Sequence, residues 1–370
     1  MRNTFGQNVS VTLFGESHGA AVGVVVDGLA PGLKIDEEFI ARRLSLRRPQ
    51  LKSDTARREK DEFRILSGVK DGFSTGSPLA LIIPNEDTRS GDYGEISALP
   101  RPSHADYAAH VKYGGFEDYR GGGHFSGRIT AAIVAAGAIL LQALENKGVT
   151  IGSHILSCGG VSDERFSLDP AAEIARLKDE IFPVLSTKKR EEMLSAILSA
   201  SAENDSAGGT IETAVCGLPA GLGEPWFDSV EGVLSHALFS LGGVKGVEFG
   251  AGFALANMRG SEANDEFYVN GNGKILTRTN HSGGVNGGIT NGMPIIFTCA
   301  VKPTASISKP QNTVNMQTHE NAILTLKGRH DPAIVRRICP VIDSVTAFVI
   351  CDFIAARYGT NALSDKDFRF

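Results

Sequence analysis

Residues 120–146 read RGGGHFSGRITAAIVAAGAILLQALEN, and this stretch decides the fold. From Ile129 to Asn146 nearly every position is apolar or small, and Gly148 follows as a helix stop signal. A helix that is hydrophobic on all sides is a buried helix. The sequence therefore predicts a helix that runs through the middle of the fold, with a glycine-rich turn directly before it.

Patterns on either side of this helix predict a mixture of strands and further helices. Strands are predicted over 8–14, 21–26, 210–216, 244–256 and 294–301, and helices over 188–198, 230–241 and 341–358. Asp36 is expected to cap a helix, and Asp169 to cap another that has Pro170 at its first position. No segment resembles a linker, and no repeat is visible. We expect one α+β domain over residues 1–370.

Composition and charge exclude several classes of protein. Hydrophobic residues make up 42% and charged residues 21% of the 370 residues, with a net charge of −5, which argues against a nucleic-acid coat. The apolar stretch Ile129–Leu141 is shorter than the ~20 residues of a membrane span, and the N-terminus lacks a signal-peptide pattern. Five scattered cysteines without a CxxC pair fit reduced thiols, so we expect a cytoplasmic protein.

One segment departs from this acidic average. Residues 42–64 contain nine basic and four acidic side chains. The plain interpretation is a solvated loop, and the alternative is a flap that closes over an anionic ligand. Charge alone does not choose between them.

The glycine-rich turn also has two interpretations. Consecutive glycines at 121–123 let a ligand approach the backbone closely, and the first N–H groups of the following helix favour an anion. Ser126 can cap that helix, and Arg120 and Arg128 flank it. A phosphate-bearing ligand fits these features, but so does a structural turn. The pattern is neither a P-loop nor a GxGxxG fingerprint.

Other polar residues also have both a functional and a structural interpretation. His18 and His104 lie in separate polar segments and can be general acids near neutral pH or structural histidines. Asp331 precedes Pro332 and can be a helix cap or a base. Residues 302–306 (KPTAS) combine a cation with two hydroxyls, which suits a phosphate-bearing chain. No spacing in the sequence indicates a metal site.

Several short motifs occur together in one order along the chain. They are GESHG (15–19), RRP (47–49), RPSHAD (101–106), YRGGGHFSGR (119–128), HSGGVNGG (281–288), KPTAS (302–306) and KGRHDP (327–332). In combination they closely resemble the chorismate synthase family, from Thr4 to about Tyr358. The resemblance implies a single-domain β-α-β sandwich of the α+β class, with helices packed between two antiparallel sheets, assembled as a homotetramer.

The resemblance also implies an activity. Members of the family are lyases that remove phosphate and a ring proton from 5-enolpyruvylshikimate 3-phosphate by 1,4-anti elimination to give chorismate, in aromatic amino acid biosynthesis. They require reduced FMN although no net redox change occurs. NADPH would act as an indirect reductant, with an external flavin reductase supplying the reduced cofactor. Neither nucleic acid nor membrane is implied as a partner.

Roles transfer residue by residue from the matching motifs. His18 resembles the acid beside the departing phosphate, His104 the acid that protonates the flavin, and Asp331 a proton-relaying base. Ser17 and Ser126 support this relay. The positions that resemble substrate contacts are Arg47, Arg101, Arg128 and Arg329, and Arg47 also matches the family's NADP contact. Those that resemble flavin contacts are His124, Phe125, Ser126, Gly242, Gly243, Gly287, Lys302, Pro303, Thr304, Ala305, Ser306 and Arg329.

This chain departs from the family pattern at several of these positions. Ser103 stands where glycine is usual, His124–Phe125 where the family has a pair such as Arg-Ser or Arg-Ala, and Gly242–Gly243 where Asn-Ala is commonest. Two other functions use the same glycines and arginines. One is a non-catalytic module that binds a phosphorylated metabolite or RNA, and the other is an NADPH-dependent flavin oxidoreductase.

Overall fold

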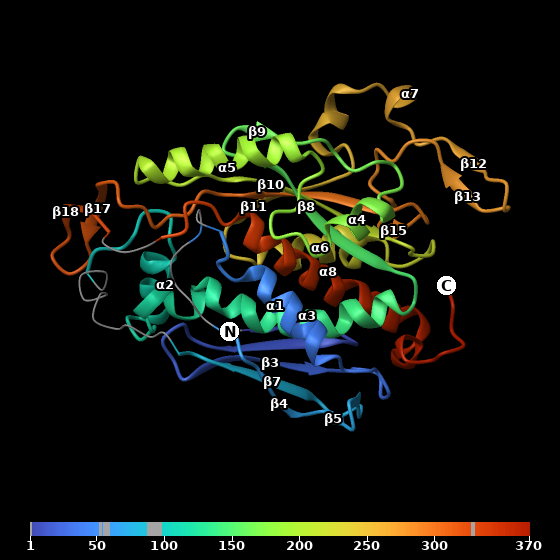
Figure 1. The fold of residues 1–370 in the computed structure, drawn as a ribbon, viewed down its shortest axis with the longest axis horizontal. Coiled ribbons are helices and arrows are strands. Elements are labelled where there is room, and N and C mark those ends of the chain that lie inside the picture. The colour runs from blue at the N-terminus through green and yellow to red at the C-terminus, as the bar shows by residue number, and fades with distance from the viewer. Residues whose placement is uncertain (1, 52–53, 55–59, 87–97, 327–329) are drawn as a thin grey trace.

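Two five-stranded antiparallel sheets enclose a layer of helices (Figure 1). The computed structural model describes residues 2–51, 54, 60–86, 98–326 and 330–370. The first sheet has the order β1 (Thr4–Phe5), β2 (Ser10–Gly15), β3 (Ala21–Asp27), β7 (Leu79–Pro84) and β4 (Arg64–Ser67). The second has the order β11 (Val244–Phe249), β16 (Ile295–Val301), β10 (Gly209–Cys216), β8 (Thr150–Cys158) and β9 (Val161–Ser162).

The helices α1 (Glu37–Arg47), α3 (Thr130–Glu145) and α8 (Val335–Tyr358) lie between the two sheets. Remaining helices are α2 (Asp106–Tyr113), α4 (Ala171–Leu177), α5 (Thr187–Ala202), α6 (Val230–Phe239) and α7 (Gly260–Ala263). Small hairpins pair β5 (Val69–Lys70) with β6 (Phe73–Ser74), β12 (Phe267–Val269) with β13 (Ile275–Thr277), β14 (Val285–Asn286) with β15 (Ile289–Thr290), and β17 (Gln311–Asn315) with β18 (Glu320–Leu324).

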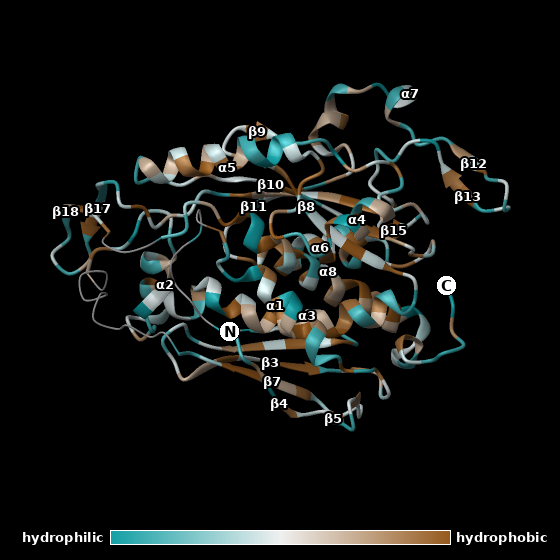
Figure 2. Cartoon of the chain, in the orientation of Figure 1, coloured by the Kyte–Doolittle hydropathy of each residue, from teal (hydrophilic) through white to brown (hydrophobic). Residues whose placement is uncertain are grey.

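The core lies where these layers meet. In α3 every residue except Thr130, Gln142 and Glu145 is buried, and the hydrophobic colouring of Figure 2 is concentrated on the inner helices and on the strands that face them. Helix α3 crosses α8 closely at Gly137, where a Cβ atom would lie 2.2 Å from the Cβ of Ser344. Glycine is therefore required at that crossing.

The sequence predicts an apolar stretch shorter than a membrane span, and this estimate of length is wrong. Two of the helices are long and apolar enough to cross a membrane by length and composition. They span Gly127–Glu145 and Val335–Tyr358, and 83% and 94% of their apolar windows are buried inside the protein. Both are therefore core helices of the fold.

The α+β class and the antiparallel sheets predicted from the sequence are confirmed, and so is the buried central helix. Asp36 caps α1 as predicted, because its Oδ1 accepts a hydrogen bond from the Phe39 backbone N–H at 3.0 Å. The predicted cap at Asp169 is wrong: Pro170 is the N-cap of α4 and makes no side-chain capping bond. Strand β11 ends at Phe249, and a 3₁₀ turn over Gly252–Asn257 replaces the rest of the predicted strand.

The last helix also begins earlier than predicted. Helix α8 contains Pro340 and starts at Val335, with Ile334 as its N-cap, so Asp331 is not the cap of this helix. Proline removes only one helical N–H bond, and burial of nearly every residue from Val335 to Ile350 compensates for that loss.

Candidate functional site

The glycine-rich turn brings the two candidate histidines together. Gly121 and Gly122 have φ values of +59° and +85°, and a Cβ on Gly121 would lie 2.5 Å from Cδ2 of His18 and 2.9 Å from Oγ of Ser17. A Cβ on Gly122 would lie 3.4 Å from Cε1 of His104. The turn therefore lies beside both imidazoles, because a Cβ added to either of these consecutive glycines would approach one of them.

The loop between β2 and β3 carries Ser17 and His18, and both side chains are buried. The Ser17 backbone N–H donates to the carbonyl of Gly123 at 3.0 Å, which attaches this loop to the glycine turn. The Ser17 hydroxyl is fully buried and has no hydrogen-bond partner among the described residues. A buried hydroxyl without a partner is costly in a closed core, so it indicates a place where a ligand atom binds.

His104 belongs to a compact charged cluster at the start of α2. Its Nδ1 lies 2.5 Å from Oδ1 of Asp106, and Arg101 donates to both oxygens of that carboxylate at 2.7 Å. Burial would raise the pKa of Asp106, but hydrogen bonds from Arg101 and His104 outweigh it and hold this pKa well below its ordinary range. The carboxylate fixes the orientation of both the imidazole and the guanidinium.

The KPTAS segment closes over this cluster. Ser306 Oγ accepts a hydrogen bond from Arg101 Nη1 at 3.3 Å, and Lys302 Nζ donates to the carbonyl of Ser103. The backbone N–H of Lys302 donates to the Gly243 carbonyl at 2.9 Å, so the glycine pair 242–243 lies beside the same segment. Burial, and then the nearby Lys245, lower the pKa of Lys302.

Arg47 and Arg128 meet at a single buried carboxylate. Arg47 Nη1 donates to one oxygen of Asp61 at 2.7 Å, and Arg128 Nη1 donates to the other. Both guanidinium groups are buried, and the Asp61 side chain is completely inaccessible. Arg128 also donates to Asn85 and to the Pro84 carbonyl, and Arg47 donates to the Gly127 carbonyl. The two cations therefore bind the same buried anion.

Asp331 forms an ion pair with Arg337 at the start of α8. Arg337 also donates from Nε to the Arg47 carbonyl at 2.7 Å, so Asp331 is connected to the Arg47 end of α1. Burial and the charge of Arg101 lower the pKa of the neighbouring His330. Arg329, a predicted substrate and flavin contact, lies outside the described residues.

The remaining predicted flavin contacts divide into two groups. Ser126 is expected from the sequence to cap the long buried helix, but it caps the short 3₁₀ helix Gly127–Ile129 before it, accepting from the Arg128 N–H at 3.3 Å, and Ile129 is the N-cap of α3. His124 Nδ1 hydrogen-bonds the Gly15 carbonyl at 2.8 Å, and Phe125 is 44% exposed beside it. Gly287 forms the second group and lies in the β14–β15 turn. The Gly288 carbonyl of this turn accepts a hydrogen bond from the Val230 N–H. Figure 1 shows β15 at the opposite side of the molecule from α2, so Gly287 lies away from the other predicted contacts.

The basic segment 42–64 is only partly a loop. Arg42, Arg43 and Arg47 belong to α1, and the last two are buried in ion pairs, so neither a solvated loop nor a flap describes this part. The predicted flap positions Lys52, Arg57 and Arg58 lie outside the described residues.

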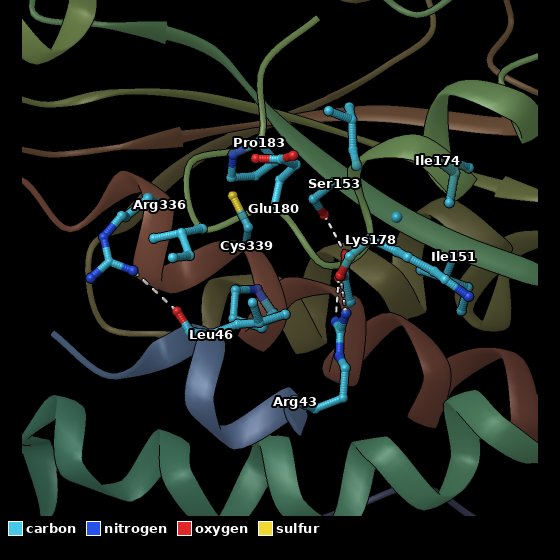
Figure 3. A pocket seen from close by; sticks show the side chains of 15 residues that line it. Arg43, Leu46, Ile151, Ser153, Ile174, Lys178, Glu180, Pro183, Arg336 and Cys339 are labelled. Atoms are coloured by element: carbon cyan, nitrogen blue, oxygen red, sulfur yellow. Dashed lines mark hydrogen bonds and ion pairs between the residues drawn. The ribbon is translucent and has the colours of Figure 1, made fainter. Parts of the chain in front are cut away.

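A separate pocket borders α1 on another side (Figure 3). Figure 3 shows Arg43 and Ser153 reaching into it, and both bind the buried carboxylate of Asp343, at 2.5 and 2.6 Å. Its volume of about 20 Å³ holds roughly one water molecule, too little for a metabolite. In the described part of the chain, no group of three His, Cys, Asp or Glu residues could hold a metal ion.

Sequence reasoning missed five residues that organise the site. They are the carboxylates Asp61 and Asp106, the amide of Asn85, and the flanking side chains His330 and Arg337. Asp106 and His330 lie inside quoted motifs, so their position next to a candidate histidine or aspartate was a usable signal. Asp61, Asn85 and Arg337 each contact a residue in a different segment of the chain, and no local sequence pattern indicates these contacts.

Comparisons with known proteins match nearly the whole chain. The family profile described as "Chorismate synthase" matches residues 9–355. The chain is similar to a chorismate synthase from Korarchaeum cryptofilum, 47% identical over 351 residues that cover 95% of this chain and 96% of that protein. One from Chitinophaga pinensis is 43% identical over 359 residues, covering 97% and 98%. A solved structure titled "Crystal Structure of Chorismate Synthase" matches with a TM-score of 0.75 and 27% identity, covering 96% of this chain and 94% of that one.

Proposed function

Because this chain belongs to the chorismate synthase family of lyases, we propose that it eliminates phosphate from 5-enolpyruvylshikimate 3-phosphate to give chorismate. The observation that carries the proposal is the meeting of His18 and His104 at Gly121–Gly122, with arginines around them. An elimination of this kind breaks a carbon–oxygen bond to phosphate and a ring carbon–hydrogen bond. It needs acids near neutral pH and cations that bind a multiply charged anion.

The residues present fit a bound reduced FMN. A backbone turn without Cβ atoms faces two imidazoles, and the hydroxyls of Ser17 and Thr304 are buried without a hydrogen-bond partner among the described residues. Ser126, His124 and residues 302–306 would hold the cofactor, with Gly242–Gly243 beside them. When bound, the reduced flavin would supply the electron-rich group that the elimination requires and would not be consumed.

The side chains divide the proton movements between them. His18 would donate a proton to the leaving phosphate, which departs with the electrons of the carbon–oxygen bond. His104, held through Nδ1 by Asp106, would keep a proton beside Gly122. Asp331 would accept the proton that the ring loses, with Arg337 beside it as the cation that balances its charge. Burial of Ser17 and His18 excludes bulk water from this step.

Arginines would hold the substrate's phosphate and two carboxylates. Arg101 keeps its orientation through Asp106 and reaches His104 at 3.0 Å, so an anion bound there also lies near the imidazole. Arg47 and Arg128, both bound to Asp61, would add two cations, and Arg329 would add another. The guanidinium fork matches phosphate and carboxylate oxygens in pairs, which the ammonium of lysine does not.

Further properties of the family are part of the proposal. We infer a single β-α-β sandwich domain over residues 1–370, a homotetramer, cytoplasmic location, and reduction of the flavin by an external reductase with NADPH as an indirect reductant near Arg47. Exposed aromatic residues support the assembly: Trp226, Phe227 and Phe253 are 86%, 94% and 83% exposed, and Phe267 adds to them on the β12–β13 hairpin. Where exposed apolar side chains form a contiguous patch, that patch commonly marks a protein–protein interface.

Phosphate release under anaerobic conditions tests the function. The protein is mixed with 5-enolpyruvylshikimate 3-phosphate and photoreduced FMN, without NADPH, and inorganic phosphate is measured over time. We expect catalytic release with reduced FMN and none with oxidised FMN. Release that requires stoichiometric NADPH would make the protein a flavin oxidoreductase. Tight substrate binding without release in either redox state would make it a binding module.

Gly121→Ala is expected to lower turnover by about 10²-fold, because a displacement near 1 Å at a reacting group costs that much. The new Cβ would lie 2.6 Å from Nε2 of His18, and the φ of +59° strains any side chain there. Gly127→Ala is the matched control, since a Cβ at Gly127 meets nothing within 4 Å. Turnover is measured beside a thermal melt. Equal turnover of the two variants would remove Gly121 from the site.

A further inference from the structure

Asn85 lies at the end of β7, between the histidine loop and Arg128. Its Nδ2 donates to the carbonyls of Glu16 and Gly19, both at 2.9 Å, which are the residues on either side of Ser17–His18. Its Oδ1 accepts from Nε of Arg128, also at 2.9 Å. Its backbone N–H donates to the Ala20 carbonyl at 3.1 Å. One amide side chain therefore holds both ends of the histidine loop and one face of an arginine.

The chemistry of the amide explains why asparagine stands here. The two carbonyls need donors and the guanidinium needs an acceptor, and a primary amide carries both on one rigid plane. A carboxylate of the same shape accepts from arginine but places an oxygen against the two carbonyls. An apolar side chain of the same size satisfies none of the three groups.

The contacts continue beyond Arg128. Arg128 binds Asp61, Asp61 binds Arg47, and Arg47 donates to the carbonyl of Gly127, which follows Ser126 at the capped turn. The histidine loop and the arginine pair are thus joined through one side chain, Asn85. A loop that carries an acid and an arginine that holds an anion must keep a fixed separation for proton transfer to a bound phosphate.

We propose that Asn85 is a positioning residue of the reaction, which sets His18 and Arg128 relative to each other and to the substrate's anionic group. The inference rests on the proposed function, because it assigns His18 and Arg128 to one bound phosphate ester. Asn85 itself touches neither substrate nor cofactor in this scheme. Its action passes through the Glu16 and Gly19 carbonyls on one side and through the guanidinium on the other.

The test compares two variants that break different contacts. Asn85→Asp keeps the acceptor for Arg128 and loses both donors to the histidine loop, whereas Asn85→Leu loses all three contacts. We expect Asn85→Asp to lower kcat about tenfold or more with KM within about twofold of the wild type, and Asn85→Leu to lower kcat similarly and also to raise KM about tenfold. Hydrogen exchange of residues 15–20 should be faster in both variants.

Steady-state phosphate release with reduced FMN gives both constants after the active fraction is determined from stoichiometric FMN binding. Asn291→Leu is the control, because its side chain donates to the Asn286 amide and accepts from the Met293 backbone N–H beside β15, on the opposite side of the molecule from α2 (Figure 1). If both Asn85 variants lose only folded protein and keep wild-type kcat and KM per active site, the residue is structural and the inference fails. A wild-type protein without phosphate release overturns the proposed function and this inference together, whereas an active wild type with unaltered variants overturns the inference alone.

Discussion

His18→Ala and His104→Ala are each expected to release phosphate about 10² to 10⁴-fold more slowly than the wild type, which is the usual contribution of a general acid. The imidazole of His18 lies beside Gly121, and that of His104 lies beside Gly122. Because they would act on different groups, neither replaces the other. FMN and substrate affinities should change little for His18→Ala. For His104→Ala, Asp106 retains Arg101 as a partner, so the cluster should stay folded.

The measurement is single-turnover phosphate release with reduced FMN, beside FMN titration and a thermal melt. His236→Ala is the control, since His236 is exposed on α6 and its ring lies 5.5 Å from that of Phe5 between centroids. A near wild-type rate in either site variant would return that histidine to a structural role. A slow rate that accompanies loss of FMN binding would assign the histidine to the cofactor instead of to proton transfer.

Asp61→Asn is expected to lower the free energy of unfolding by about 3–5 kcal/mol, the usual cost of removing one partner from a buried ion pair. The Asp61 carboxylate is completely buried between Arg47 and Arg128, and the amide of asparagine carries no charge to balance them. Inorganic phosphate should restore part of the lost stability, because an anion bound beside the two guanidinium groups balances charge that Asp61 balances in the wild type.

Denaturant melts in chloride and in phosphate at equal ionic strength measure both effects. Glu62→Gln is the control, since this neighbouring carboxylate is 71% exposed and its loss should cost within about 0.5 kcal/mol. If Asp61→Asn is as stable as the wild type, the two arginines do not depend on Asp61. If chloride and phosphate protect the variant equally, the pair does not select oxyanions.

How far the sequence predicts this structure depends on the range of the interaction. The all-round hydrophobicity of Ile129–Asn146 identified a buried helix, since that signal lies in consecutive residues. The cap at Asp36 followed from local chemistry. The cap predicted at Asp169 is wrong because its strong local preference is overridden by tertiary packing, and α8 begins at Val335, before the predicted start at residue 341, with Pro340 inside it.

In the candidate site, too, local motifs are predicted from the sequence and contacts between distant segments are not. The motifs identified His18, His104 and the glycine turn, and the contacts of the turn bring those residues together. They did not indicate that Arg47 and Arg128 share Asp61, because the three residues come from α1, from the turn before α3 and from the segment before β4. Ion pairs between distant segments leave no periodic trace in a single sequence, so charge counting placed Arg47 only in a basic segment that could be a solvated loop or a flap.

Helix α8 has a further consequence, which concerns the order in which the protein is made. It packs against α1, α3, α6, β8, β10 and β2, all of which precede it in the chain. Asp352 on this helix accepts backbone N–H bonds from Gln7, Asn8 and Val9 at 3.0, 2.6 and 2.9 Å. Until residues 335–358 leave the ribosome, β8 and β10 of the second sheet and the helices α1, α3 and α6 lack the helix that packs against them. The chain therefore cannot complete its core in sections during synthesis, and a nascent chain that stalls before Val335 exposes apolar surface that aggregates or binds a chaperone.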